Sequence, residues 1–222
     1  MRGVITDWGG VMTTPIPDTI RAWLQVEGID RDEYVAVMRG WVAGAYQADA
    51  GLAGVGHNGE RNPVHALERG DCTPAEFEAV LASRLVRHDG VTVSPDGLLA
   101  RMFAASRPAP AMYELIRALR GAGYRTALLS NSWGDGDYPR ADFPGLFDMV
   151  VISGEVGMRK PEPEIFRHAA DALGLPLDEC VFIDDAEANI AAAEACGMTG
   201  VHHTAPEITI AALEDLFGIV LR

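Results

Sequence analysis

The sequence is poor in basic residues and has almost no lysine. Its 222 residues carry 18 Lys and Arg against 32 Asp and Glu, giving a net charge of −14, and Lys160 is the sole lysine. Binding to duplex nucleic acid or to an anionic membrane surface requires clustered basic side chains. The sequence contains no such cluster. We therefore expect neither nucleic acid nor a membrane as a partner.

Cysteines and long apolar runs are also scarce. The three cysteines, Cys72, Cys180 and Cys196, are far apart and lack C-x-x-C spacing, which argues against a disulfide scaffold and favours a reducing compartment. No apolar run has the length of a membrane span. The first apolar run is interrupted at Asp7, unlike the core of a signal peptide. These features predict a cytoplasmic protein.

Two kinds of pattern divide the chain. A short apolar run at residues 2–7 reads as a buried strand, whereas residues 18–105 carry only helical signals, such as the apolar stripe from Tyr34 to Trp41. From about residue 108 onward, apolar strands alternate with helices of about a dozen residues. The alternation predicts parallel β-α-β units, with a helical insertion after the first strand.

The predicted fold class is α/β. We expect a Rossmann-like three-layer α/β/α core around a parallel sheet, formed by residues 1–14 and 106–222, and an all-helical insertion at residues 15–105. Two capping boxes are predicted as well, one starting at Thr73 and one at Thr204, because each Thr is followed three residues later by Glu.

Polar side chains follow the predicted strands. The carboxyl ends of parallel strands meet at one edge of a sheet, where ligands bind. Carboxylates suit Mg²⁺, and Ser, Asn and Lys suit phosphoryl oxygens. The residues expected at this edge are Asp7, Ser130-Asn131, Lys160 and Asp184-Asp185. The sequence therefore predicts a site for a divalent cation and a phosphate.

These residues, in this order, resemble the motifs of the haloacid dehalogenase superfamily of hydrolases, specifically subfamily IA with a helical C1 cap. The resemblance spans essentially the whole chain and is carried by LLSNS (128–132), GEVGMRKPEPEIF (154–166) and VFIDDAEANIAAAEACGM (181–198). It implies that the helical insertion is a cap domain. It also implies a Mg²⁺-dependent phosphomonoester hydrolase that acts on a small phosphorylated metabolite.

The resemblance further implies a role for each residue. Asp7 would be the nucleophile that forms an aspartyl-phosphate, and Lys160 would neutralise the charge of the reacting oxygens. Ser130 and the backbone near Asn131 would bind the phosphoryl group. The implied Mg²⁺ ligands are Asp7, the carbonyl of Gly9, Asp184 and Asp185. The sequence leaves the substrate, the pathway and the oligomeric state open.

Gly9 departs from the family pattern. Most phosphatases of the superfamily have an Asp at this position, two residues after the nucleophile, and a positioned acid of this kind contributes about 10²–10⁴ in rate. Three explanations stay open. In the first, the cap supplies the acid, with His57 as the candidate, and in the second, the substrate has a good leaving group, as a sugar 1-phosphate does. In the third, the chain is a weak or inactive member of the family that binds a phosphometabolite. A 2-haloacid dehalogenase also lacks this Asp, but the acid pair Asp184-Asp185 favours Mg²⁺ and phosphate.

Overall fold

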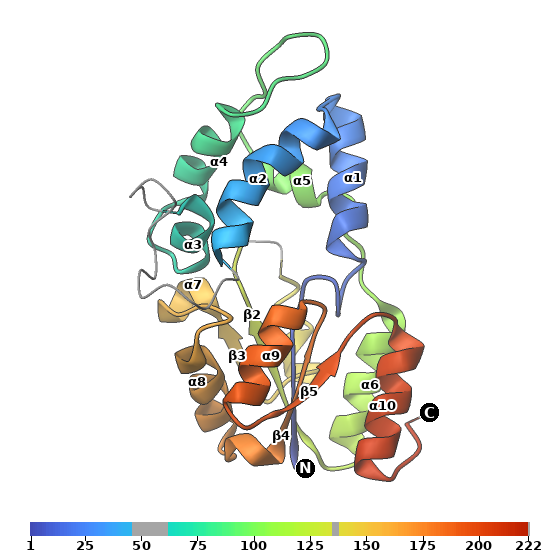
Figure 1. Ribbon diagram of the computed structural model, residues 1–222. Helices are drawn as coiled ribbons and strands as arrows, with labels where there is room; N and C mark the ends of the chain where they lie inside the picture. Colours follow the sequence, from blue (N-terminus) through green and yellow to red (C-terminus); the bar gives the residue numbers. More distant parts are fainter. Residues whose placement is uncertain (46–61, 135–137, 222) are drawn as a thin grey trace. The chain divides into compact units, whose positions relative to one another are not determined.

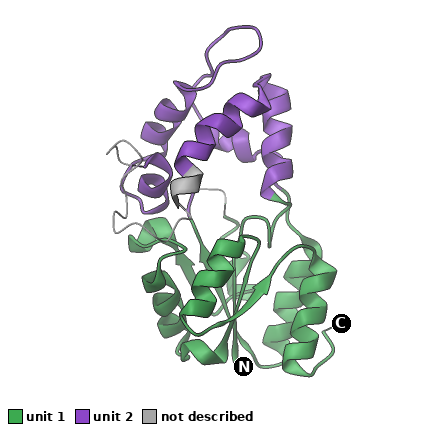
Figure 2. Ribbon diagram, in the orientation of Figure 1, with its two compact units in different colours: residues 1–15, 107–131, 137–222 green, residues 16–106, 132–136 purple. Residues whose placement is uncertain are grey.

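The computed structural model describes residues 1–45, 62–134 and 138–221 (Figure 1). The chain forms two compact units (Figure 2). Unit 1 comprises Met1–Pro15, Arg107–Asn131 and Asp137–Arg222, and unit 2 comprises Ile16–Ser106 and Ser132–Gly136. The sequence patterns placed boundaries after residues 14 and 105, within one residue of two of these divisions. They did not indicate that the short segment after Asn131 belongs to unit 2.

Unit 1 is built on a parallel sheet, which confirms the predicted fold class. Within the described residues the sheet has five strands in the order β3-β2-β1-β4-β5, and all four neighbouring pairs are parallel. The strands are β1 (Gly3–Thr6), β2 (Arg125–Ser130), β3 (Met149–Ile152), β4 (Cys180–Asp184) and β5 (Thr199–His202). The first strand of the chain therefore lies in the centre of the sheet, between β2 and β4.

Helices cover both faces of this sheet. They are α6 (Pro110–Gly121), α7 (Ser153–Val156), α8 (Pro163–Leu173), α9 (Glu187–Ala195) and α10 (Pro206–Phe217), with 3₁₀ turns at Phe143–Gly145 and Leu177–Glu179. Val4 and Val181 pack with side chains of α6 and α10, which lie side by side in Figure 1. Ile5 and Phe182 pack on the opposite face with side chains of α8 and α9. Successive strand residues thus alternate between two cores, as a sheet buried on both faces requires.

Unit 2 is helical, as the sequence predicted for this region. Its helices are α1 (Ile16–Glu27), α2 (Arg31–Ala45), α3 (Pro63–Glu68), α4 (Pro74–Ala82) and α5 (Leu98–Phe103). Its core includes Trp23, Phe77 and Met102. Trp133, from the short segment after Asn131, joins this core with ring centroids 5.7 Å from Phe77 and 5.9 Å from Phe103. The glycine-rich stretch 51–59 and His57 lie outside the described residues.

One capping prediction is confirmed and the other is wrong. At α4 the Thr73 hydroxyl accepts the N–H of Glu76, and the Glu76 carboxylate accepts the N–H of Thr73. At α10 the residue before the first turn is Ala205, which makes no side-chain cap bond. Proline fits the first helical position because it lacks an N–H. Pro206 therefore puts Ala205 in the cap position and leaves Thr204 one residue outside the helix.

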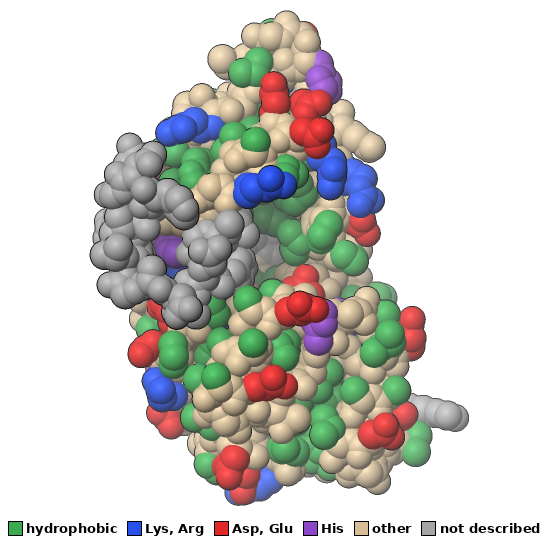
Figure 3. Space-filling view, in the orientation of Figure 1, with side chains coloured by type: hydrophobic (Ala, Val, Ile, Leu, Met, Phe, Trp, Pro, Cys, Tyr) green, Lys and Arg blue, Asp and Glu red, His purple; other side chains and the backbone are tan. Residues whose placement is uncertain are grey.

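The described part of the chain contains no helix with both the length and the apolar character of a membrane span. On the face shown in Figure 3, Lys and Arg side chains form small separate groups interspersed with Asp and Glu. This face presents no continuous basic surface, in keeping with the net charge of −14.

Candidate active site

The carboxyl end of the sheet brings together residues that are far apart in the sequence. Thr6 of β1 is in register with Ile183 of β4, so Asp7 and Asp184 follow on neighbouring strands. The Asp7 N–H donates to the Ile183 carbonyl at 2.8 Å, which fixes where the Asp7 side chain leaves the sheet. The strand order reverses between β1 and β4, and such a reversal opens a crevice for ligands in parallel sheets.

Lys160 lies at the centre of the charged groups. Its side chain is 1% exposed, and its Nζ lies 2.7 Å from Asp7 Oδ1 and 2.6 Å from Asp184 Oδ2. Burial alone lowers the pKa of Lys160, whereas the carboxylates of Asp184 and Asp7 raise it, and the net shift is upward. The ammonium group therefore stays protonated and supplies a permanent positive charge between the two acids.

Asn131 holds the backbone of Lys160. Its Nδ2 donates to the Lys160 carbonyl at 3.0 Å, and the Lys160 N–H donates to Asn131 Oδ1 at 2.9 Å. The peptide bond between Lys160 and Pro161 is cis. Both the nitrogen and the oxygen of the Asn131 side-chain amide are therefore hydrogen-bonded to Lys160. A phosphate bound at this position would be contacted by the main chain of Asn131.

Asp184 is held by its own loop. It is fully buried, and Asn189 Nδ2 donates to both of its carboxylate oxygens, at 3.0 and 3.1 Å. The Ala186 N–H donates to Asp184 Oδ1 at 2.8 Å. With the bond from Lys160, these contacts restrict the carboxylate to one orientation.

The residues present fit a divalent cation. Asp7, Asp184 and Asp185 each offer a carboxylate oxygen, and these oxygens lie within 4.8 Å of one another. Burial raises the pKa of Asp7 to about 7, with the charges of Asp184 and Asp185 adding to the shift and Lys160 opposing it. Burial and then the charge of Asp184 raise the pKa of Asp185 to about 6. Three carboxylates against one ammonium leave negative charge that a hard cation such as Mg²⁺ would offset.

Gly10 belongs to the site and was missed as a functional residue in the sequence, where it reads only as part of a turn. Its φ is +80°, and an added Cβ would lie 2.2 Å from Asp185 Oδ2. The positive φ favours glycine at this position, and a side chain here would displace the Asp185 carboxylate, a candidate metal ligand. The expectation that the Gly9 carbonyl binds the metal stays a prediction.

Ser130 ends β2 and is 2% exposed. Its hydroxyl lies 2.9 Å from the hydroxyl of Tyr138, whose ring packs against Trp8 at a centroid distance of 5.8 Å. No sequence motif singles out Tyr138, because it lies in an irregular segment between β2 and β3. It approaches Ser130 only through the tertiary structure.

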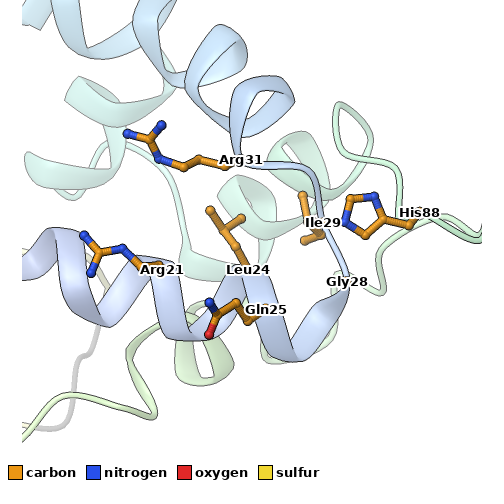
Figure 4. Close-up of a pocket in the computed structure, with 7 residues that line it drawn as sticks. All are labelled: Arg21, Leu24, Gln25, Gly28, Ile29, Arg31 and His88. Carbon is orange, nitrogen blue, oxygen red and sulfur yellow. The ribbon is translucent and has the colours of Figure 1, made fainter.

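Unit 2 contains a separate pocket of about 350 Å³ (Figure 4). Its lining includes Arg21, Leu24, Gln25, Ile29, Arg31 and His88. The two arginines face nearby acids on the surface, with Arg21 2.8 Å from Asp18 and Arg31 3.9 Å from Asp32. None of the site residues predicted from the sequence lines this pocket.

Comparisons with known proteins identify a matching family model and several relatives. The family model for haloacid dehalogenase-like hydrolases matches residues 1–197. The chain is 33% identical over 121 residues to the sesquiterpene phosphatase astK of Aspergillus oryzae, covering 50% of this chain and 59% of that protein. It is 28% identical over 228 residues to acyl-CoA dehydrogenase family member 10 of Mus musculus, covering 100% of this chain and 20% of that protein. The chain thus spans less than two thirds of these relatives.

Solved structures share the fold. An enzyme of the HAD family from Bacteroides thetaiotaomicron, in complex with magnesium and inorganic phosphate, matches with a TM-score of 0.59 and 24% identity over 92% of this chain and 95% of that one. A HAD phosphatase from Thermococcus onnurineus matches with a TM-score of 0.59 and 18% identity over 100% of both chains. At these identities the likeness shows the fold alone.

Proposed function

Because the chain belongs to the haloacid dehalogenase-like hydrolases, we propose that it is a Mg²⁺-dependent phosphatase that hydrolyses the phosphomonoester of a small metabolite in the cytoplasm. The observation that carries the proposal is the buried contact of Lys160 with both Asp7 and Asp184 at the carboxyl end of the sheet. A relative that is named a sesquiterpene phosphatase supports the choice of phosphate chemistry.

Asp7 is the proposed nucleophile. Lys160 holds Asp7 Oδ1, which leaves the other carboxylate oxygen to attack phosphorus. The P–O bond to the leaving group breaks as the aspartyl-phosphate forms, and water then cleaves this acyl-phosphate to release inorganic phosphate and restore Asp7.

The surrounding residues bind and neutralise charge. Ser130 and the main chain at Asn131 are proposed to bind the phosphoryl oxygens, and the Lys160 ammonium offsets their charge. Mg²⁺ would be held by Asp7, the Gly9 carbonyl, Asp184 and Asp185, and it would reduce the repulsion between an anionic nucleophile and an anionic phosphate.

The leaving group is the weak point of the reaction, because Gly9 offers no acid to protonate it. We expect the rate to fall steeply as the pKa of the leaving alcohol rises, so an aryl phosphate should react much faster than an alkyl phosphate. Gly9→Asp should accelerate the alkyl phosphate more than the aryl phosphate. No acceleration of either substrate, in an active wild type, would show that another group already supplies the proton.

The direct test is release of inorganic phosphate from p-nitrophenyl phosphate and a panel of sugar phosphates, with Mg²⁺ and with EDTA. We expect release that requires Mg²⁺ and disappears in Asp7→Asn. Folded wild-type protein that releases no phosphate across the panel would contradict the proposal, as would full activity in Asp7→Asn.

A second candidate function follows from Gly9 itself. A chain that kept the metal and phosphate site without the acid would act as a phosphometabolite-binding module. It would bind inorganic phosphate in a Mg²⁺-dependent way without turnover. Calorimetry measures this binding, and the phosphate-release assay shows whether hydrolysis accompanies it. Chloride release from a 2-haloacid without added metal would instead identify a dehalogenase.

A further inference from the structure

Tyr138 is held next to Ser130 by a hydrogen bond and by the packing of its ring. Its hydroxyl lies 2.9 Å from Ser130 Oγ. Its ring packs against Trp8 at 5.8 Å and against Phe143 at 6.2 Å between centroids. Trp8 directly follows Asp7 and also contacts Phe143, at 5.7 Å. The three rings therefore hold the phenol at one place beside the carboxyl ends of β1 and β2.

The distance between the two hydroxyls allows either one to donate, and their relative acidity favours one direction. Burial raises the pKa of Tyr138 to about 12, although the hydrogen bond with Ser130 opposes this shift, so the phenol keeps its proton. A phenol is more acidic than an alcohol and is the stronger donor. The Tyr138 O–H therefore donates, and Ser130 Oγ accepts.

This direction leaves the hydrogen of Ser130 free to point elsewhere. Its other hydrogen-bond acceptor among the residues that the structure describes is the Asn131 carbonyl, at a long distance of 3.5 Å. An anionic oxygen is a much better acceptor than a carbonyl held at that distance.

We propose that Tyr138 is a positioning residue, which donates its hydrogen bond to Ser130 and so makes the Ser130 hydroxyl a dedicated donor to a phosphoryl oxygen. This inference rests on the proposed phosphatase function. It predicts that Tyr138 acts through Ser130. Once the Ser130 hydroxyl is removed, Tyr138 should have little effect on phosphate binding or hydrolysis.

The test is a double-mutant cycle with Tyr138→Phe, Ser130→Ala and the combined variant. Tyr138→Phe removes the hydroxyl and keeps the ring packed. The matched control is Tyr113→Phe, since Tyr113 also packs against Trp8, at 6.1 Å, and its buried hydroxyl has no hydrogen-bond partner among the described residues. The readouts are kcat/KM for p-nitrophenyl phosphate and the Kd of inorganic phosphate with Mg²⁺. Thermal unfolding verifies that each variant is folded.

We expect Tyr138→Phe to lower kcat/KM and phosphate affinity about 3- to 10-fold, the size of one lost hydrogen bond. In the Ser130→Ala background the same change should have no effect, and Tyr113→Phe should match the wild type. An unchanged Tyr138→Phe, or an equal loss in both backgrounds, would overturn this inference while phosphatase activity stands. Wild-type protein that neither hydrolyses nor binds phosphate would overturn the proposed function itself.

Discussion

A cationic side chain of the unit 1 site and one that lines the unit 2 pocket both pair with carboxylates, but their surroundings differ. Arg21 and Asp18 of unit 2 are 2.8 Å apart with side chains 61% and 57% exposed. Lys160 is 1% exposed between Asp7 and Asp184. Water screens the first pair, whereas the buried charges depend on one another, and Lys160 and Asp7 each shift the pKa of the other. Both regions contain opposite charges, so the burial of these charges is what distinguishes the candidate active site of unit 1 from the surface pair of unit 2.

The largest expected difference between the two regions is in turnover. Asp7→Asn should lower phosphate release by about 10⁴-fold or more, because it removes the proposed nucleophile. Asp18→Asn changes the same chemical group beside Arg21 and should leave release unchanged. The measurement is kcat with p-nitrophenyl phosphate and Mg²⁺. Comparable losses in both variants would mean that Asp7 has no special role.

The next difference is in stability. Lys160→Gln leaves buried carboxylates without their cation and should lower the free energy of unfolding by about 3–5 kcal/mol in metal-free buffer. Arg21→Gln breaks an exposed pair and should cost less than about 1 kcal/mol. Urea unfolding followed by circular dichroism measures both. Equal costs would show that burial of Lys160 does not make its charge indispensable.

Two glycines sharpen the comparison further. Gly10 and Gly28 have φ values of +80° and +68°, but an added Cβ meets Asp185 Oδ2 at 2.2 Å in the first case and finds its nearest atom, in His88, at 4.0 Å in the second. Alanine at either position should cost about 1–3 kcal/mol in backbone strain. Gly10→Ala should in addition weaken Mg²⁺ binding in a calorimetric titration, whereas Gly28→Ala should not. Identical Mg²⁺ affinities would remove Asp185 from the proposed ligands.

The smallest expected effect concerns pH. His203 is buried, and its Nδ1 lies 2.8 Å from the Thr209 hydroxyl. Burial lowers the pKa of His203 below its usual 6.5, so the unfolded chain binds more protons as the pH falls through this range. The contribution of His203 to stability should therefore be complete above pH 6.5 and decline as the pH falls toward its folded-state pKa, whereas the raised pKa values of Asp7 and Asp185 act in the opposite direction.

The variant His203→Gln should reduce this decline, and His88→Gln, at an exposed position of unit 2, should keep it. Unfolding free energies between pH 5 and 8 test the expectation. A decline that is the same in both variants would assign the pH dependence to other groups.

Local sequence patterns predicted the parallel sheet and the polar residues at the ends of its strands. Buried strands alternate with amphipathic helices, and Asp7, Ser130 and Asp184 stand at strand ends, so a parallel fold brings them to one edge. The Thr204 capping box failed for an equally local reason, because the position of Pro206 decides where the helix starts. Local sequence patterns therefore predict a structural feature well when the residues that determine the feature are close together in the sequence.

Contacts between distant segments were not predictable in this way. Trp133 follows the phosphate-site strand in the sequence but packs into the core of unit 2. Asn131 directly follows β2, and no sequence pattern indicates that its side chain binds the backbone of Lys160. In each case the side chain could pack against or hydrogen-bond to several kinds of partner, and the tertiary structure determines which partner it contacts.

By itself, the sequence determined the fold class, the family and the residues that meet at the edge of the sheet, because strand periodicity and motif order are written along the chain. The tertiary structure alone decided that Lys160 lies between Asp7 and Asp184, that Gly10 leaves room for Asp185, and that Tyr138 reaches Ser130. These relations depend on distances of a few ångströms between segments separated by many residues. Packing sets such distances, and no local pattern encodes them.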